Sequence, residues 1–551
     1  MKFLPKLVAT VMSVALVLSA GASASAAKIE NATTNANSNA SLIAADFDVS
    51  GTKLEPKTAL PDAYSSREIG LTTPVRDQLY NTCWAYGSLA TLESAQLKAG
   101  ITTPVFSPMH MNHWGITRED GTGWIRNEYG GGYSYIALGY FSSWQGPRLD
   151  IDYPINVYPT QFSELDSSTK KQLAVNGIIY LDTGDVETVK TAIYNYGAVV
   201  GNYHVNDSYY NSFTNAYYCN IEGLTTAQLF GHCISIVGWD DNYARENFSS
   251  IAQPENDGAW LCKNSWGDSW GDGGYYWISY EDFYLFDTRF GHSYAFCDVD
   301  NYSYKKNIYQ NETDGATYEF EYLSANTITY VNVFDTDSEY TVLEEVNFET
   351  ISDGAKYDIY LIPVSEDGAP VNDMNKWTLL KSGTVEYQGY HNIDTEDMLI
   401  ESDKFAVGVS LKNQKGSGNS IGVSEWLSTG EDNYIFLPQS QRGSSYIMVG
   451  SDSMDVMDFY YNHLDGDEIG GTFVIKAVAS SNRETGDCDL DGRVSVLDAT
   501  YVQRYLALIT DMPFLSQAFA DYDSDGDISI TDATRIQMKI ANIPTFEDPF
   551  E

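Results

Sequence analysis

The C-terminal part of the chain contains a 14-residue stretch that occurs twice, and this duplication constrains folding more than any other feature. The first copy begins at Asp487 and the second begins 34 residues later at Asp521. Both copies have aspartates at positions 1, 3, 5 and 12 and a glycine at position 6. Carboxylates spaced so closely repel one another unless a hard cation neutralises them. The repeated register therefore predicts two metal-binding loops rather than a pair of acidic surface loops.

The spacing matches the calcium loop of an EF-hand, with Asp in place of Glu at position 12. Each loop leads into a helix-like segment, Ala499–Ala507 and Ala533–Ala541. Two such loop-helix units resemble a type I dockerin over residues 485–545. The resemblance implies two bound Ca²⁺ ions and docking onto a cohesin module of a scaffold protein, as in cellulosomes. The positions that usually face the cohesin, Val496-Leu497 and Ile530-Thr531, differ between the copies, so the partner class stays open. The predicted metal-binding residues are Asp487, Asp489, Asp491, Arg493, Asp498, Asp521, Asp523, Asp525, Asp527 and Asp532.

The stretch Gln78–Ser88 contains a single cysteine, Cys83, at the start of a helix-like run that ends near Gly100. Leu89 and Leu92 keep helical spacing in this run. A thiol at a helix N-terminus lies at the positive end of the backbone dipole, which favours the nucleophilic thiolate. Taken alone, the stretch is equally consistent with an inert buried cysteine.

Three further motifs follow along the chain. A glycine-rich loop spans Tyr129–Tyr133, and His232 stands at the start of a strand-like apolar run that ends at Trp239. Asn264 lies in the sequence Lys-Asn-Ser-Trp-Gly. Each motif is weak by itself, because a lone histidine beside a strand is usually structural and a lone asparagine usually belongs to a turn.

In their order, the motifs Cys-Trp-Ala-Tyr-Gly-Ser, Gly-Gly, Gly-His-Cys-Ile and Lys-Asn-Ser-Trp-Gly resemble a papain-like cysteine peptidase over residues 61–297. The resemblance implies an α+β papain-like fold and peptide hydrolysis through a thioester intermediate, with no cofactor for catalysis. It implies Cys83 as nucleophile, His232 as base and Asn264 as the amide that orients the imidazole. The remaining implied residues are Gln78 in the oxyanion hole, Gly131 and Gly132 against the substrate backbone, and Trp266 shielding the Asn–His contact.

Some features depart from this family. Gln78 lies five residues before Cys83, one fewer than is usual, and the structural cysteine normally found between them is absent. The oxyanion loop is therefore expected to be reshaped. Asp241–Gly258 looks like an insertion, and the segment before residue 61 is too short for the usual inhibitory pro-segment. Latency is then expected from the insertion or from the next domain.

Residues 303–478 change in character and predict a β-sandwich. Strand-like runs separated by turns include Lys356–Pro363, Phe405–Leu411 and Thr472–Val478. In the second run large apolar residues alternate with small ones, so one face should be core. The stretch resembles the lectin-like domain that follows the peptidase in some bacterial papain relatives. Aromatic residues such as Tyr357, Tyr360 and Trp426 suit sugar stacking or ordinary sheet packing, and no sugar site is assigned.

The chain has 32 Lys+Arg and 76 Asp+Glu, so its formal net charge is -44. This composition excludes a nucleic-acid partner, because binding of phosphate groups requires a basic surface. The six cysteines are scattered and form neither a disulfide framework nor a zinc motif. Residues 1–26 have a charged start, an apolar run and a small-residue cleavage site, which predict a secretion signal. Residues 27–60 follow as a flexible leader, and no later run is long enough to span a membrane.

The sequence thus predicts a secreted multidomain protein. A papain-like peptidase (61–297) precedes a lectin-like β-sandwich (303–478) and a small all-α dockerin with two EF-hand-like calcium loops (485–545). The predicted activity is that of a cysteine endopeptidase tethered to an extracellular, cellulosome-like complex. One alternative is a catalytically silent component that binds protein or polysaccharide. Another is a transpeptidase or a processing enzyme acting only on components of the complex.

Overall fold

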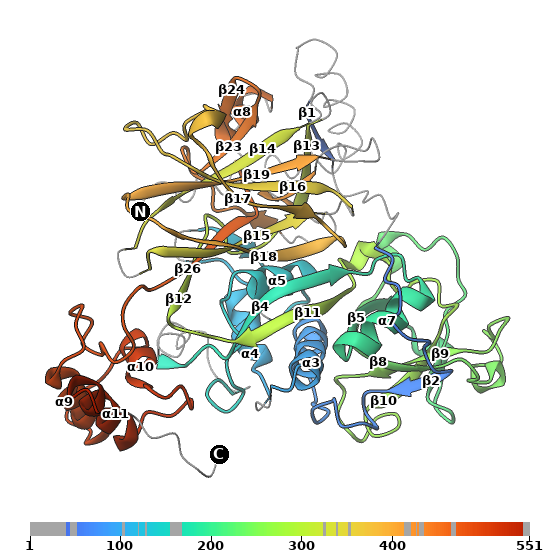
Figure 1. Cartoon of the computed structure of the whole chain (residues 1–551). Helices are drawn as coiled ribbons and strands as arrows, with labels where there is room; N and C mark the ends of the chain where they lie inside the picture. Colours follow the sequence, from blue (N-terminus) through green and yellow to red (C-terminus); the bar gives the residue numbers. More distant parts are fainter. Residues whose placement is uncertain are drawn as a thin grey trace, which may run out of the picture.

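The computed structural model shows three parts in sequence order, with the dockerin-like helices at one corner (Figure 1). The predicted signal, residues 1–26, and Trp426 lie outside the described residues, as do most of the leader and the last two residues of the predicted dockerin. The described residues are 40–43, 52–101, 105–118, 121–126, 129–154, 168–322, 327–337, 340–350, 354–412, 420–425, 427–428, 435–463 and 470–543.

The first part is organised around helix α3 (Cys83–Lys98), whose residues from Trp84 to Gln96 are all buried. The helix packs against β8 (Gly231–Asp240) and β11 (Tyr294–Asn301). A Cβ at Gly87 would lie 2.8 Å from the Cys233 sulfur, so the close approach of helix and sheet requires glycine there. The other helices are α4 (Pro108–Trp114), α5 (Ser134–Ser142) and α7 (Val186–Tyr196). The other strands are β2 (Ala63–Ser65), β3 (Gly123–Ile125), β4 (Leu173–Tyr180), β5 (Val199–His204), β6 (Tyr210–Asn211), β7 (Ala216–Tyr217), β9 (Ala259–Lys263) and β10 (Tyr275–Ser279).

The second part is a β-sandwich, as predicted. One layer is a six-stranded sheet in the order β17-β16-β19-β14-β23-β24, and the other contains β12-β26-β15-β18. Alternate residues of β19 (Lys404–Lys412) from Phe405 to Leu411 lie in the core between the layers, together with Val346 and Phe348 of β15. The small residues between them are also buried, so both faces of this strand are covered. The other bounds are β12 (Lys306–Tyr309), β13 (Tyr318–Tyr322), β14 (Ile328–Asp335), β15 (Val342–Thr350), β16 (Lys356–Ile362), β17 (Thr378–Thr384), β18 (Gly389–Leu399), β20 (Ile421–Glu425), β21 (Leu427–Ser428), β22 (Ile435–Leu437), β23 (Ser445–Val449), β24 (Asp452–Asp455), α8 (Val456–His463), β25 (Gly471–Phe473) and β26 (Ile475–Ser480).

The first two parts share one continuous 13-stranded sheet. Strand β18 of the sandwich pairs antiparallel with β4, with Gly389 opposite Ile179 and Tyr390 opposite Ile178. A second pairing across the two parts joins β22 to β3. The peptidase part therefore does not end at a free sheet edge, and its strand hydrogen bonds continue into the sandwich.

Parts of the segment predicted as a flexible leader are attached to the body. Strand β1 (Ala40–Ile43) pairs antiparallel with β13. Thr52 is buried, and its hydroxyl accepts a 2.8 Å hydrogen bond from the Gln388 N–H. Strand pairing uses backbone N–H and C=O groups, which every residue type carries. The low apolar content of the leader therefore gave no sign that β1 pairs with β13.

The third part consists of helices α9 (Val496–Leu506), α10 (Phe514–Ala520) and α11 (Ile530–Ile540). Helices α9 and α11 begin three residues earlier than predicted, because the side chains of Ser495 and Ser529 accept hydrogen bonds from their first turns. The module contacts the body through rings of Tyr304 and Phe514, whose centroids are 4.9 Å apart. No helix in the described ranges combines the length and apolar character that a bilayer-spanning segment needs.

A buried ion pair supports the turn where the sandwich meets α5. The Lys476 ammonium lies 2.8 Å from the Glu312 carboxylate, and neither side chain is more than 1% exposed. The same carboxylate accepts the backbone N–H of Asp314, which in turn forms an ion pair with Arg118 of the peptidase part. The Asp314 carbonyl is so close to Gly139 of α5 that a Cβ there would be 2.1 Å away.

We expect Glu312→Ala to lower the free energy of unfolding by about 3–5 kcal/mol, because it removes the carboxylate that neutralises the buried Lys476 ammonium. The 2.9 Å hydrogen bond from Lys476 to Gln310 Oε1 remains but carries no compensating charge. Chemical denaturation of the full chain measures this. Removing the exposed Lys412, which pairs with Asp358, is the matched control and should cost less than about 1 kcal/mol. Equal losses in both variants would contradict the importance of the buried pair.

Candidate active site

Cys83 is the first residue of α3, and this partly buried cysteine lines a cavity of about 150 Å³. His232 lines the same cavity, and so do Gly131 and Gly132 of the glycine-rich loop. The remaining lining residues are Trp84, Tyr133, Asn202, Thr226, Leu229, Gly231, Cys233, Arg289 and Phe290. The structure thus brings the cysteine, histidine and glycine motifs to one place.

His232 and Asn264 meet through strand pairing. His232 is near the start of β8 and Asn264 directly follows β9, and these strands pair antiparallel with Ser235 opposite Lys263. His232 Nε2 and Asn264 Oδ1 are 2.8 Å apart, and both residues are buried. The Trp266 ring stacks on the imidazole with a centroid distance of 4.7 Å and an interplanar angle of 27°. The carboxamide therefore orients the ring, and the indole covers it.

Burial shifts both reactive groups toward their neutral forms. Desolvation lowers the pKa of His232 to about 4, and the hydrogen bond to Asn264 opposes this shift. Desolvation also raises the pKa of the Cys83 thiol above its usual value, with backbone hydrogen bonds acting in the opposite direction. Burial therefore acts against the thiolate that the helix N-terminus is predicted to favour.

Gln78 lies beside this site but does not line the cavity described above. Its backbone N–H donates to the Ser265 carbonyl at 2.7 Å, and its side-chain Oε1 accepts from the Ser265 hydroxyl at 2.6 Å. Its Nε2 donates to the Tyr80 carbonyl at 2.9 Å. The amide is well oriented, but its donor has a partner within its own loop.

The glycine-rich loop approaches the indole of Trp84 closely. A Cβ at Gly132 would lie 2.5 Å from Trp84 Nε1, so glycine is required at this position. The Gly131 carbonyl accepts a 3.1 Å hydrogen bond from Arg126. This arrangement keeps the loop backbone, rather than a side chain, at the cavity.

The 241–258 insertion is held away from the cavity, and none of its residues is among those that line it. Its Tyr243 ring stacks on Trp277 at 4.6 Å, and the Glu281 carboxylate accepts the N–H of Glu255 and of Asn256. These contacts give no support to a role of the insertion in latency.

Several cavity residues carry no motif and were missed by sequence reasoning. Asn202 comes from β5, where its side chain donates to the His292 carbonyl, and Arg289 is held by Asp287. Phe290 lies against Gly231, where a Cβ would be 2.7 Å from the Phe290 ring. Their approach depends on the pairing of β5, β8 and β11, so no local signal in the sequence could have identified them.

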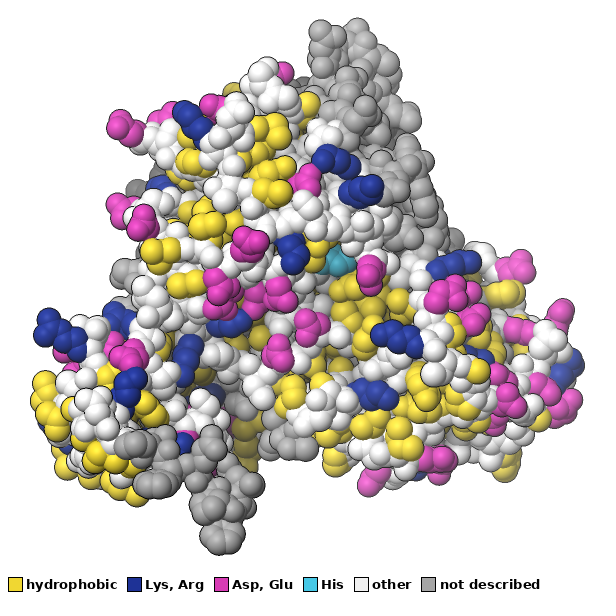
Figure 2. Space-filling model, viewed as in Figure 1, with side chains coloured by type: hydrophobic (Ala, Val, Ile, Leu, Met, Phe, Trp, Pro, Cys, Tyr) yellow, Lys and Arg dark blue, Asp and Glu magenta, His cyan; other side chains and the backbone are white. Residues whose placement is uncertain are grey.

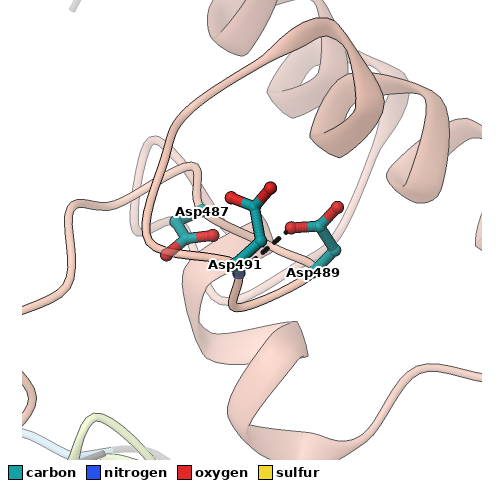
Figure 3. Close-up of side chains that lie close together, drawn as sticks. All are labelled: Asp487, Asp489 and Asp491. Carbon is teal, nitrogen blue, oxygen red and sulfur yellow. Dashed lines mark hydrogen bonds between the residues drawn. The ribbon is translucent and has the colours of Figure 1, made fainter.

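The two acidic loops bring their aspartates together as predicted. Ligand oxygens of Asp487, Asp489 and Asp491 all lie within 4.8 Å of one another, and so do those of Asp521, Asp523 and Asp525. Figure 3 shows the first cluster, with the Asp489 carboxylate accepting the Asp491 N–H.

One buried oxygen in each loop, Oδ1 of Asp487 and Oδ1 of Asp523, has no hydrogen-bond partner among the described residues. The other oxygen of each of these residues is paired, Asp487 with Arg483 and Asp523 with Arg535. Converging carboxylates with one buried oxygen left unpartnered in each loop fit a hard divalent cation such as Ca²⁺.

The other predicted ligands have different positions. Asp498 and Asp532 accept backbone N–H groups, including those of Cys488 and Tyr522, and so close their loops. The backbone N–H groups of Arg493 and Asp527 donate to the aspartates two residues earlier. At position 12 of the loops, Asp498 and Asp532 therefore bond to the loop backbone and are not among the three clustered aspartates.

Fold and site together define a class of protein. In this class a papain-type thiol centre is joined to a β-sandwich and to a helical module with two loops of the calcium-binding type. The family model "Papain family cysteine protease" matches residues 60–289, "Lectin like domain" matches 308–478, and "Dockerin type I domain" matches 485–541.

Solved structures agree with this class. The cysteine protease and lectin-like domains of Cwp84, a surface layer associated protein of Clostridium difficile, are 31% identical with a TM-score of 0.69, covering 83% of this chain and 96% of that chain. A structure of clostridial Cwp84 after propeptide cleavage is 33% identical with a TM-score of 0.67, covering 76% and 99%. The chain therefore belongs to the papain family of cysteine proteases and carries a lectin-like domain and a type I dockerin.

Curated relatives match the peptidase part. The cysteine protease RD19B of Arabidopsis thaliana is 25% identical over 227 residues, and cathepsin K of Mus musculus is 24% identical over 222 residues. These matches cover 40% and 39% of this chain, and the chain spans 59% of the length of each relative.

We expect Asn264→Ala to lower kcat/KM by about 10²-fold, because the imidazole loses the group that orients it. Since the hydrogen bond to Asn264 raises the pKa of His232, its loss should also move the acid limb of the pH profile to lower pH. Asn264→Asp introduces a carboxylate and should move that limb to higher pH. Steady-state kinetics between pH 3 and 8 checks both signs, and shifts in the same direction would contradict the assignment.

Proposed function

We propose that this protein is a secreted cysteine endopeptidase that hydrolyses peptide bonds through Cys83, His232 and Asn264. The observation that carries the proposal is that His232, which lies 2.8 Å from Asn264, lines the same cavity as the Cys83 thiol. In this reaction the His232 ring takes the thiol proton as the sulfur attacks the scissile carbonyl carbon. The imidazolium then protonates the leaving amine, which leaves an acyl thioester, and water activated by the neutral imidazole releases the acid.

Oxyanion stabilisation is assigned to the backbone N–H of Cys83 and the side chain of Gln78. The Ser265 hydroxyl holds Gln78 Oε1, so Nε2 is the atom free to change partners. It would exchange the Tyr80 carbonyl for the oxyanion as the tetrahedral intermediate forms. A donor of this kind typically contributes about 10²–10³-fold to the rate.

The proposed substrate is an extended peptide. The backbone of Gly131 and Gly132 lies at the cavity without side chains, which suits backbone pairing with a substrate. Trp266 covers the His232 ring and shields the Asn–His contact from water.

The dockerin part is proposed to bind two Ca²⁺ ions and to dock onto a cohesin module of an extracellular scaffold protein. Val496, Leu497 and Ile530 at the start of α9 and α11 are 60–62% exposed, which suits an apolar docking surface. Figure 2 shows hydrophobic side chains gathered on this module and acidic side chains over the other two parts. A secreted, surface-associated location is supported by the likeness to Cwp84, which is named a surface layer associated protein. The proposal also includes binding of polysaccharide by the sandwich.

We expect Cys83→Ala to abolish peptide hydrolysis while the melting temperature stays close to that of the wild type. Cleavage of a mixed peptide library measures turnover, and an epoxide thiol inhibitor should label the wild type but not this variant. Cys297→Ala is the matched control, because Cys297 is also a half-buried free thiol, and it should retain activity. Wild-type protein that neither cleaves nor becomes labelled would favour the catalytically silent alternative, and aminolysis in excess amine would favour a transpeptidase.

We expect calorimetric titration of the metal-free full chain with CaCl₂ to show two binding events, and Asp523→Asn to remove one of them. Metal binding and folding of such a module form one equilibrium, so EGTA should unfold residues 485–543 and abolish cohesin capture. Asp452→Asn, at an exposed site in the sandwich, is the control. Cohesin binding that survives EGTA would contradict the calcium requirement.

A further inference from the structure

Two tyrosines contact each other between the loops that carry the nucleophile and the glycines. Tyr80 lies three residues before Cys83, and Tyr129 lies two residues before Gly131. Their ring centroids are 4.6 Å apart with an interplanar angle of 75°, an edge-to-face arrangement. Both rings remain about half exposed, at 48% and 50%.

The backbone of Tyr80 is in the left-handed region, with a φ of 58°. This conformation is uncommon for a residue with a large side chain and persists only where its surroundings hold it. The Tyr80 carbonyl accepts the Gln78 Nε2 hydrogen bond, and the ring packs on Tyr129. One residue therefore links the Gln78 amide to the glycine-rich loop.

The segment that follows β9 makes further contacts with the nucleophile loop. Gln78 is bonded to Ser265 through its N–H and its Oε1, and Asp77 forms a backbone bridge with Trp266. All six cysteines are free, so no disulfide joins the nucleophile loop to the glycine-rich loop. Between these two loops, the tyrosine contact adds to the close packing of Gly132 against Trp84.

We propose that Tyr80 and Tyr129 form an aromatic clasp that positions Gln78 for oxyanion stabilisation. The inference rests on the proposed peptidase function. The clasp holds Tyr80 in its left-handed conformation, which keeps the Tyr80 carbonyl beside Gln78 Nε2 and the amide close to where the oxyanion forms. Both tyrosines are positioning residues that act through Gln78, because neither is among the cavity-lining residues.

A residue that acts only through an oxyanion donor should affect the transition state and not substrate binding. Tyr129→Ala is therefore expected to lower kcat by about 3- to 10-fold, the range to which aromatic-pair energies correspond. KM should stay within about twofold of the wild-type value, since ground-state contacts are kept. Tyr129→Phe keeps the ring edge and should retain wild-type kinetics.

The decisive experiment compares Tyr129→Ala in two backgrounds, wild type and Gln78→Ala. The loss of kcat should disappear in the Gln78→Ala background, because the group through which the clasp acts is gone. Phe213→Ala, at a ring that is 97% exposed in a turn far along the chain, should change nothing. Equal losses in both backgrounds, or a raised KM with unchanged kcat, would overturn the clasp.

A second readout keeps the clasp separate from the proposed activity. Amide hydrogen exchange of residues 76–82 should be faster in Tyr129→Ala than in the wild type, whether or not the protein hydrolyses peptides. Unchanged exchange would overturn the clasp even in an active enzyme. Absence of turnover in the wild type together with faster exchange in the variant would overturn the peptidase assignment and leave the clasp supported.

Discussion

The hydrogen bond between His232 and Asn264 depends on the antiparallel pairing of β8 and β9, and the rest of the site is arranged around it. The pairing places the two residues at the same end of neighbouring strands although 32 positions separate them. Helix α3 packs across β8 at Gly87, so its first residue, Cys83, lines the same cavity as His232. A loss of this register would separate all three groups at once, since a one-residue slip turns every side chain of a strand to the other face.

The continuous sheet gives the sandwich a structural role in the peptidase part. Strand β4 is hydrogen-bonded on both sides, to β11 and to β18, so the sandwich covers what would otherwise be an exposed edge. The turn around Asp314 presses on α5, the helix that begins directly after the glycine-rich loop. The lectin-like domain is thus a part of the scaffold that holds the glycine-rich loop, besides any ligand it binds itself.

Burial affects ionisable side chains differently in the peptidase part and in the dockerin. In the peptidase part burial disfavours the charged forms of His232 and Cys83. In the dockerin loops the aspartates stay close together with buried oxygens unpaired, an arrangement that a divalent cation completes. Both cases follow from the cost of placing charge away from water.

The sequence by itself determined the order of the three parts, the identity of the motif residues and the two acidic loops, because these depend on local spacing and residue type. Helix α3, the alternating strand β19 and the loop aspartates all follow from such local patterns. Only the tertiary structure decided that Gln78 donates within its own loop, that the insertion lies away from the cavity, and that the sandwich continues the peptidase sheet. The physical reason is that these features arise from backbone pairing and burial between distant segments, which no local pattern of side chains encodes.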